Sequence, residues 1–471
     1  MSARTKLVCT LGPASATPKM LRGLVEAGAT VFRINTSHGT ADDHHRSLTL
    51  VREAEAAIGR PLSVLADLPG PKVRLGEVRP DPIALRPGQP FQLRSSGPGD
   101  ERGAATTYPE LAADLEVGDR VLLADGAVEL TVGAIEDGVV VTECVRGGRI
   151  GSHQGVNVAA DRLRLPPVTR RDREILEDLL AMGVDLVAQS FVRSPADVEE
   201  LRAAMGDRTV PIVAKIETRP AADDFDAILA VSDAAMVARG DLGVELPMEE
   251  IPLVQKRLLQ QARSAGRPVI VATQMLESMI RAPRPTRAEA NDVATAVLDG
   301  ADAIMLSAET AVGDFPFEAA SAATRIAEVA ESQGHRFRAA LPEVPHSGEA
   351  AAVAHAAASI VAGDPDVVAI TCYTTTGRTA ALLAAERPDV PIHAFIPNAQ
   401  VRRANGLLWG VNAVPADPPS DTDAMISMMD AGLRELGLAE DGDVVVMAAS
   451  MPAGRTTTNM LKVHQVGSIE G

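Results

Sequence analysis

The feature that most constrains the fold is a repeated alternation of short apolar runs with amphipathic helical stretches. The runs hold mainly Val, Ile, Leu and Ala, which is typical of buried parallel strands whose two faces are both covered. They are Thr5–Cys9, Val31–Ile34, Leu62–Ala66, Asp185–Gln189, Ile212–Lys215, Ala234–Ala238, Val269–Ala272 and Ala303–Leu306. Eight such units predict a (β/α)8 barrel. The alternative is a doubly wound open sheet, but no Gly-x-Gly-x-x-Gly follows any of the runs.

Two further patterns divide the chain, which at 471 residues is too long for a single core. Between the third and fourth runs, short alternating segments such as Val128–Val132 and Val139–Cys144 are separated by Gly and Asp turns, with no convincing helix. After about Gln333, Ala-rich helical stretches alternate with the strand-like runs Asp366–Cys372, Pro391–Phe395 and Asp443–Ala448. We therefore expect a barrel of residues 1–71 and 168–333, an inserted all-β domain of residues 72–167, and a C-terminal α/β domain of residues 334–471.

Composition narrows the partners and the compartment. The formal net charge of −18 argues against binding of nucleic acid, because a basic face could not easily offset it, and disfavours anionic membrane surfaces. An anionic substrate would therefore need local positive charge in its own site. The cysteines Cys9, Cys144 and Cys372 form no Cys-x-x-Cys pair, which is typical of reduced thiols. Because there is also no apolar run of about 18 residues and no signal-like N-terminus, we expect a cytoplasmic protein.

Polar and charged side chains gather where the predicted strands end. In chain order they are Arg33, Asp67, Ser190, Lys215 with Glu217, Arg239 to Asp241, Thr273 with Gln274, and Ser307 with Glu309. The beginnings of the strands are mostly plain. Active sites of (β/α)8 barrels lie at the C-terminal ends of the strands, so this asymmetry predicts one functional site rather than scattered surface polarity.

These residue types indicate a metal-assisted reaction on an anionic substrate. Lys215 and Glu217 lie two residues apart and share a face if the strand continues that far, although alone they would read as a surface ion pair. Glu217 and Asp241 are hard ligands that suit Mg²⁺, or Mn²⁺ in its place, and the set lacks the His and Cys that zinc favours. Arg33, Lys215 and Arg239 would add charge for a substrate bearing carboxylate and phosphate groups. Phosphoryl transfer or enolate chemistry fits; acyl transfer does not, because the serines lie in no Gly-x-Ser-x-Gly setting.

Several long motifs resemble those of pyruvate kinases, in one order along nearly the whole chain. They are CTLGPAS (Cys9–Ser15), FRINTSHG (Phe32–Gly39), ADLPGPKVRLG (Ala66–Gly76), AKIET (Ala214–Thr218), ARGDLGVELP (Ala238–Pro247), ATQMLESM (Ala272–Met279), PRPTRAEANDVATAVLDGADAIMLSAETAVGDFP (Pro283–Pro316) and TTTNMLKVHQVG (Thr456–Gly467). The resemblance implies phosphoryl transfer from phosphoenolpyruvate to ADP in glycolysis, giving pyruvate and ATP. It also implies a (β/α)8 TIM barrel with a mobile β-barrel lid after the third strand, a C-terminal effector domain and a homotetramer.

The resemblance implies roles for individual residues. Arg33 and Lys215 would hold the transferred phosphoryl group, while Glu217 and Asp241 would bind Mg²⁺. Thr273 would lie near the face where the enolate is protonated, so that Lys215, Arg33 and Thr273 are the implied catalytic residues. The implied substrate-binding residues are Arg33, Gly240, Asp241 and Thr273. Those implied to face the nucleotide are Asn35, Thr36, Ser37, His38 and Arg74. Where the family often has a lysine in the lid, this chain has Gln154, which leaves one nucleotide phosphate contact open.

One departure from the family bears on monovalent cations. Members that require K⁺ hold it with residues matched here by Asn35, Ser37 and Asp67, and they read Asp-Thr-Lys-Gly-Pro-Glu where this chain reads Asp67-Leu68-Pro69-Gly70-Pro71-Lys72. A glutamate there adds negative charge that K⁺ must offset before an anionic substrate binds. Lys72 would supply a tethered ammonium in place of that cation, unless it is only a solvated hinge residue. We therefore expect catalysis that needs Mg²⁺ but not K⁺.

A threonine-rich turn predicts a phosphate site in the C-terminal domain. Thr374, Thr375, Thr376, Gly377, Arg378 and Thr379 follow a predicted strand and open a helix, where hydroxyls and backbone N–H groups suit a phosphate. An ordinary capped helix would give the same pattern. The family places a sugar-phosphate effector here, under a loop matched by Met451–Thr457, which looks short and has Thr456 where many relatives have glycine. We expect activation by a phosphorylated metabolite, with AMP, a sugar monophosphate and a bisphosphate all open.

Two other functions remain as alternatives at this point. A different Mg²⁺-dependent barrel enzyme acting on phosphoenolpyruvate or pyruvate would share the metal carboxylates but would have no reason for the lid and the C-terminal domain. A catalytically inactive binding protein would be expected to lose Lys215, Glu217 or Asp241, and all three are present. The sequence leaves open the ultimate proton donor and the effect of Gln154 on nucleotide preference.

Overall fold

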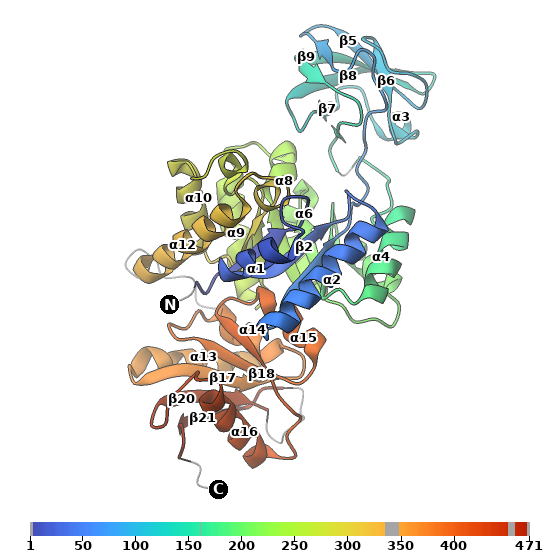
Figure 1. The fold of residues 1–471 in the computed structure, drawn as a ribbon. Coiled ribbons are helices and arrows are strands. Elements are labelled where there is room, and N and C mark those ends of the chain that lie inside the picture. The colour runs from blue at the N-terminus through green and yellow to red at the C-terminus, as the bar shows by residue number, and fades with distance from the viewer. Residues whose placement is uncertain (1–2, 161, 335–347, 451–456, 469–471) are drawn as a thin grey trace.

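The computed structural model describes residues 3–160, 162–334, 348–450 and 457–468. The barrel lies in the middle of an elongated molecule, with the inserted domain at one end and the C-terminal domain at the other (Figure 1). Within these ranges, no helix is both long and apolar enough to span a membrane.

In the described part of the chain, eight parallel strands close into a barrel in the order β1-β16-β15-β14-β13-β12-β3-β2. They are β1 (Lys6–Thr10), β2 (Ala29–Asn35), β3 (Ser63–Asp67), β12 (Leu186–Gln189), β13 (Ile212–Ile216), β14 (Ala234–Ala238), β15 (Val269–Ala272) and β16 (Ala303–Leu306). Val8, Leu65, Met236 and Ile270 fill the barrel interior, and the opposite strand faces pack on the helices. Burial of both faces explains the continuous apolar runs, and the predicted (β/α)8 fold is confirmed.

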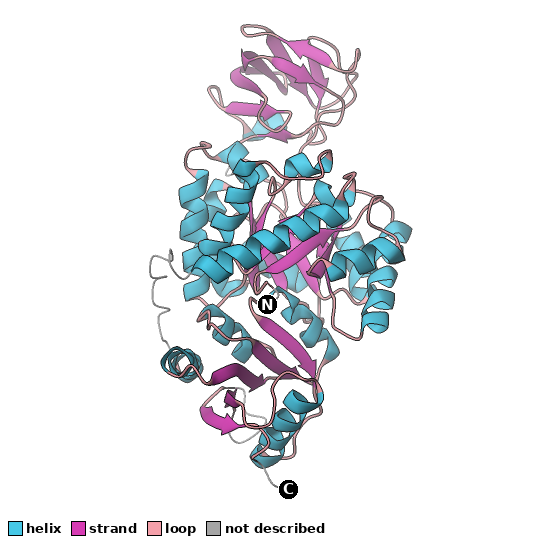
Figure 2. Ribbon diagram, turned by 60° about the vertical axis from the view of Figure 1, so that its left-hand side comes forward, coloured by secondary structure: helices cyan, strands magenta, loops and turns pink. Residues whose placement is uncertain are grey.

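Helices surround the barrel strands as an outer layer (Figure 2). They are α1 (Pro18–Glu26), α2 (Ala41–Ile58), α4 (Arg170–Met182), α5 (Pro195–Ala204), α6 (Arg219–Asp223), α7 (Phe225–Val231), α8 (Arg239–Glu245), α9 (Ile251–Ser264), α10 (Arg287–Leu298), α11 (Ala308–Ala311) and α12 (Pro316–Gly334), with a 3₁₀ turn η1 at Glu277–Ile280. Local signals set several helix starts. Thr17 caps α1 by accepting a hydrogen bond from the Met20 N–H, and Thr169 forms a capping box with Asp172 at the start of α4.

The inserted domain leaves the barrel after β3 and returns before α4. In the described residues it contains a six-stranded sheet, β11-β7-β8-β9-β5-β6, and a two-stranded sheet, β10-β4. The strands are β4 (Ile83–Leu85), β5 (Pro90–Arg94), β6 (Gly103–Ala105), β7 (Arg120–Leu123), β8 (Val128–Glu136), β9 (Val139–Arg146), β10 (Gly148–Ile150) and β11 (Val156–Asn157), with one helical turn α3 (Leu111–Asp114). The domain has its own apolar core, which includes Phe91, Leu93 and Val121. The predicted all-β character is confirmed apart from the short α3.

The C-terminal domain is built on a sheet that, within the described residues, has the strand order β19-β18-β17-β20-β21. The strands are β17 (Val367–Tyr373), β18 (Ile392–Ile396), β19 (Val411–Pro415), β20 (Val444–Ala449) and β21 (Met460–Gln465); the helices are α13 (Glu349–Gly363), α14 (Arg378–Ala385), α15 (Ala399–Ala404) and α16 (Thr422–Glu435), with a 3₁₀ turn η2 at Asn405–Leu407. The sequence did not predict β19 and β21. Both are edge strands with several exposed or half-buried residues, so they lack the continuous apolar run used to find the others.

The expectation that the strand beginnings are plain was wrong, because charges at this end of the barrel bind the C-terminal domain. Asp185, fully buried ahead of β12, accepts hydrogen bonds from Arg403 Nε at 2.7 Å and Arg52 Nη2 at 2.6 Å. Asp302, ahead of β16, pairs with Arg387 Nη1 at 2.8 Å. These pairs span sequence separations that no local pattern reveals.

Candidate active site

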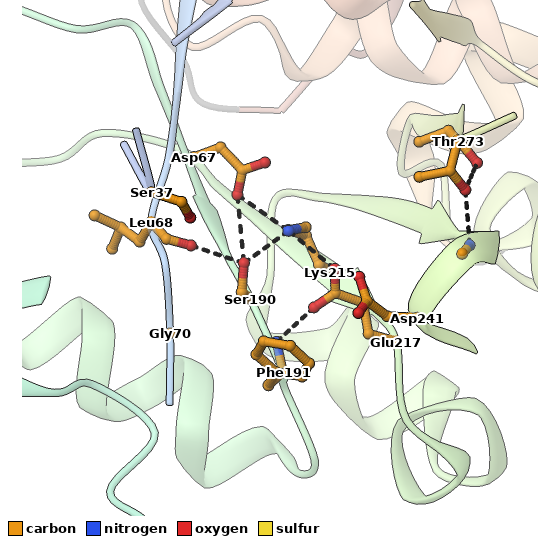
Figure 3. Close-up of polar contacts among 12 residues, drawn as sticks. Ser37, Asp67, Leu68, Gly70, Ser190, Phe191, Lys215, Glu217, Asp241 and Thr273 are labelled. Atoms are coloured by element: carbon orange, nitrogen blue, oxygen red, sulfur yellow. Dashed lines mark hydrogen bonds and ion pairs between the residues drawn. The ribbon is translucent and has the colours of Figure 1, made fainter. Parts of the chain in front are cut away.

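Lys215 is the centre of a buried polar cluster at the C-terminal end of β13 (Figure 3). Its ammonium nitrogen lies 2.9 Å from Glu217 Oε1 and 3.2 Å from Asp67 Oδ1. It also donates to Ser190 Oγ at 2.7 Å. The predicted shared face of Lys215 and Glu217 is confirmed by their contact. Burial by itself would lower the pKa of Lys215, but the charges of Asp67 and Glu217 raise it above its usual value, so the side chain is a cation.

Arg33 adds a second cation to the cluster from the end of β2. Its Nε lies 2.6 Å from Asp67 Oδ2, and its Nη1 donates to Thr10 Oγ1 at 3.2 Å. Burial opposes ionisation of Asp67, yet Lys215 and Arg33 hold the pKa of that carboxyl below its usual range. Asp67 therefore bridges the two cations, Arg33 and Lys215, and fixes the distance between them.

Glu217 and Asp241 form a pair of carboxylates beside Lys215, and Figure 3 shows them next to each other. Glu217 Oε2 accepts a hydrogen bond from the Phe191 N–H at 2.8 Å. Burial raises the pKa of Glu217, and the charge of Asp241 raises it further against the pull of Lys215. Two acids that repel each other in a buried site are stabilised by an added cation. In the described ranges no three His, Cys, Asp or Glu side chains gather into a metal site, so a divalent ion here would also need ligands from substrate or water.

Thr273 directly follows β15. Its Oγ1 accepts a hydrogen bond from the Gly240 N–H at 2.8 Å. Its backbone has φ +69°, and Gln274 follows with φ +55°. A β-branched residue in the left-handed region is strained by about 1–3 kcal/mol, and such strain gathers at functional sites.

Arg239 does not contribute the charge that the sequence led us to expect. Its guanidinium makes a two-pronged ion pair with Asp292 of α10, at 2.6 and 2.7 Å. The same side chain donates to the Thr273 carbonyl at 2.8 Å. Its charge is thus neutralised by Asp292, and Arg239 fixes the strained turn at Thr273.

The loop after β2 carries the residues expected to face a nucleotide. Asn35 Oδ1 accepts from the Ser37 N–H at 3.2 Å. Thr36 is fully buried, and its hydroxyl donates to the Asp67 carbonyl at 2.7 Å, so its side chain shapes the loop. His38 is exposed. Arg74 lies in the inserted domain and donates to the His153 carbonyl at 3.1 Å.

Lys72 contacts a carboxylate that the sequence did not suggest as its partner. Its ammonium is 3.1 Å from Asp241 Oδ1 and 5.8 Å from the centre of the Phe191 ring. The expected partners were Asn35, Ser37 and Asp67, but Asp67 already pairs with Arg33 and Lys215. Lys72 therefore pairs with Asp241, one of the two carboxylates, from the hinge of the inserted domain. The side chain of Gln154 accepts a hydrogen bond from the Gly151 N–H at 2.8 Å within its own loop.

Sequence reasoning missed the part played by the turn after β12. Ser190 stood among the polar strand ends without a role, and Phe191 was not considered. The structure places Ser190 against Lys215 and the Phe191 N–H against Glu217. The signal available was position alone, because residues that directly follow a barrel strand line its C-terminal mouth.

The threonine-rich turn of the C-terminal domain lines a cavity of about 470 Å³ against the beginnings of the barrel strands. Its lining includes Thr375, Thr376, Gly377, Arg378 and Arg267. The other two members of the predicted set, Thr374 and Thr379, are buried behind it. The cap of α14 is Gly377, with φ +84°, rather than a threonine. Burial and the charge of Arg267 lower the pKa of Arg378. Most of the predicted closing loop, from Met451 to Thr456, lies outside the residues that the structure describes.

Comparisons with known proteins cover both the barrel and the C-terminal domain. Residues 2–320 match a family model described as "Pyruvate kinase, barrel domain", and residues 351–464 match "Pyruvate kinase, alpha/beta domain". A curated pyruvate kinase from Mycobacterium tuberculosis is 44% identical over 472 residues, covering 99% of both chains. One from Corynebacterium glutamicum is 42% identical over 472 residues, covering 99% of this chain and 98% of the relative. A crystal structure of a pyruvate kinase from Cryptosporidium parvum, at 33% identity, matches with a TM-score of 0.90 over 98% of this chain and 96% of that chain.

Proposed function

The chain belongs to the pyruvate kinase family, and from that premise we propose how its site transfers a phosphoryl group. Family membership makes it a phosphotransferase acting on phosphoenolpyruvate and ADP. In this reaction the bond between phosphorus and the enol oxygen breaks, and a terminal oxygen of ADP forms the new bond. The enolate left behind takes up a proton at its methylene carbon and becomes pyruvate. A coupled assay of pyruvate formed from phosphoenolpyruvate and ADP tests this function and separates it from both alternatives.

The observation that carries the mechanism is the pair of cations held by Asp67. Lys215 at 3.2 Å and Arg33 at 2.6 Å from that carboxylate are fixed side by side before substrate arrives. We assign them to the phosphoryl oxygens, whose charge is spread over the group as it passes between donor and acceptor. Charges that are placed in advance cost no reorganisation during the reaction, which is why they lower the barrier.

We assign the metal to Glu217 and Asp241. These carboxylates repel each other, and their hard oxygen atoms are suitable ligands for Mg²⁺ or, in its place, Mn²⁺. When bound, such a cation would neutralise charge on the substrate oxygens. We assign the remaining end of the substrate, its carboxylate and enolate, to Thr273 and Gly240. The hydrogen bond of 2.8 Å between these two residues holds the turn in its strained form.

We assign ADP or ATP to the mouth of the site, between the loop after β2 and the inserted domain. Asn35, Ser37 and His38 stand on one side and Arg74 on the other. Thr36 supports this loop from beneath. The inserted domain, residues 72–167, would act as a lid that brings Arg74 toward the nucleotide, with residues 1–71 and 168–333 as the catalytic barrel and 334–471 as the effector domain. By family membership we also propose a homotetramer working in cytoplasmic glycolysis; light scattering of the purified protein tests the assembly.

We propose that the reaction does not require K⁺. The support is the ammonium of Lys72, which stands 3.1 Å from Asp241 and so adds one tethered positive charge to the site. The test compares rates in KCl and in tetramethylammonium chloride at equal ionic strength. A difference below about threefold, under 1 kcal/mol, supports the proposal, and activation of about tenfold by K⁺ contradicts it.

We propose that a phosphorylated metabolite activates the enzyme from the cavity beside α14. The support is the chemistry of the lining: Arg267 and Arg378 repel each other there, and a phosphate would relieve that repulsion. The helix N-terminus at Gly377 adds backbone donors. The test measures phosphoenolpyruvate saturation with AMP, a sugar monophosphate and a sugar bisphosphate. If none of them changes the saturation curve, the cavity is not an effector site.

A further inference from the structure

The ammonium of Lys215 has all of its donors engaged, and only one acceptor is neutral. An ammonium carries three N–H groups, and its partners are Asp67, Glu217 and Ser190. The two carboxylates limit the movement of the Lys215 ammonium, because both attract it. The third N–H group lies on the side that faces neither carboxylate, so a contact there limits movement of the ammonium in that direction. Ser190 Oγ, at 2.7 Å, is that contact.

The hydroxyl of Ser190 is itself oriented by the backbone. Ser190 is buried, and its single proton has two acceptors in reach, the Leu68 carbonyl at 2.7 Å and Asp67 Oδ1 at 3.4 Å. The shorter contact takes the proton, so the oxygen lone pairs are left facing Lys215. The Leu68 N–H in turn donates to the Ala188 carbonyl at 3.0 Å. Leu68 is therefore held by its N–H to β12 and by its carbonyl to Ser190, the residue that directly follows β12.

Close packing keeps this arrangement in place. A Cβ added to Gly70 would lie 2.9 Å from Ser190 Cβ and 3.2 Å from the Phe191 ring, and Gly70 has φ +67°. The hinge of the inserted domain thus passes directly over the turn at Ser190 and Phe191. The same turn holds Glu217 through the Phe191 N–H. Lys215 of β13 and Glu217, which directly follows that strand, are consequently both held by the turn after β12, as Figure 3 shows.

We propose that Ser190 is a positioning residue for Lys215, a role that rests on the assignment of Lys215 to the transferred phosphoryl group. Ser190 touches the ammonium and the hinge, and acts on the reaction through them. Its hydroxyl holds the positive charge at the one orientation that meets the phosphoryl oxygens. A displacement of about 1 Å in such a group costs on the order of 10²-fold in rate. Ser190 would therefore affect the rate through the position of Lys215, although its own side chain is neutral.

The test uses variants that separate the hydroxyl from the volume of the side chain. Ser190→Thr keeps the hydroxyl and adds a methyl group, whereas Ser190→Val has nearly the same shape without the hydroxyl. We expect kcat of Ser190→Val to fall by about 10–10²-fold while Ser190→Thr stays within about fivefold of wild type. KM for phosphoenolpyruvate should change less than about threefold in both. Equal losses in Thr and Val would show that volume, not the hydroxyl, matters and would overturn the proposal.

Ser190→Ala gives a second measurement if the larger side chains prevent folding. We expect its kcat to fall in the same range, with Mn²⁺ affinity of the substrate-free enzyme within about twofold of wild type by electron paramagnetic resonance. The matched control is Ser232→Ala, which removes another fully buried hydroxyl, one that caps α7 through the Ile228 carbonyl at 2.9 Å. A normal kcat in Ser190→Ala, or a loss shared with weakened Mn²⁺ binding, contradicts positioning. An inactive Lys215→Met beside a normal Ser190→Ala would leave the proposed function intact and remove only this role.

Discussion

Replacing His393 by methionine should remove most of the acid sensitivity of the C-terminal domain. His393 lies on β18, is 2% exposed, and has no hydrogen-bond partner on either ring nitrogen. Burial lowers its pKa from 6.5 to about 4. Because the ring is neutral and unpartnered, an apolar side chain of similar volume loses no hydrogen bond there.

The sign and size of the effect follow from proton binding. Below pH 6.5 the unfolded chain protonates this histidine, while the folded chain stays neutral until about pH 4, so folding stability falls as the pH is lowered through that window. Lowering the pH through the full window reduces the free energy of unfolding by about 3 kcal/mol, and lowering it from 7.5 to 5.0 reduces it by about 2 kcal/mol. For a domain of this size that corresponds to a fall of about 1 M in the urea midpoint.

The single tryptophan of the chain, Trp409, is buried in this domain, where Arg4 and Arg387 contact its ring, and its fluorescence reports unfolding of the domain. We expect the urea midpoint of wild type to fall by about 1 M more than that of His393→Met between pH 7.5 and 5.0. The control is His45→Gln, an exposed histidine on α2, which should follow wild type. Parallel pH dependence in wild type and His393→Met would refute the reasoning, because the buried neutral ring would then contribute nothing.

Three further predictions concern the site and the effector cavity. Lys215→Met should lower kcat by about 10³-fold or more while Mn²⁺ binding persists; a loss under tenfold, about 1.4 kcal/mol, removes Lys215 from the mechanism. Lys72→Glu should slow the enzyme and make part of the loss recoverable with K⁺, and a variant as fast as wild type in tetramethylammonium chloride argues against a role for that ammonium. Arg378→Gln should lower the affinity for the phosphorylated activator, whichever one shifts the wild-type saturation curve, by about tenfold or more, as expected for a lost charge-assisted contact to phosphate. An unchanged response to that activator would place the effector site elsewhere.

The sequence by itself determined the features that depend on neighbours along the chain. Strand and helix alternation, the Thr17 and Thr169 caps and the break after β3 all rest on local periodicity and turn chemistry. The strands Ala234–Ala238 and Val269–Ala272 were predicted at their observed limits. Closure of the barrel then brings the strand ends together, so Lys215, Glu217 and Asp67 could be expected in one site from topology alone.

Tertiary structure decided which of those charged side chains meet. Arg239 and Lys72 both looked like free positive charges for the substrate. The structure pairs the first with Asp292, from a helix 53 residues later, and the second with Asp241, 169 residues later. The same holds for Asp185 and Asp302, which pair with Arg403 and Arg387 of the C-terminal domain. An ion pair forms with whichever opposite charge the packed fold brings within about 4 Å, and side-chain periodicity along one strand or helix carries no record of that choice.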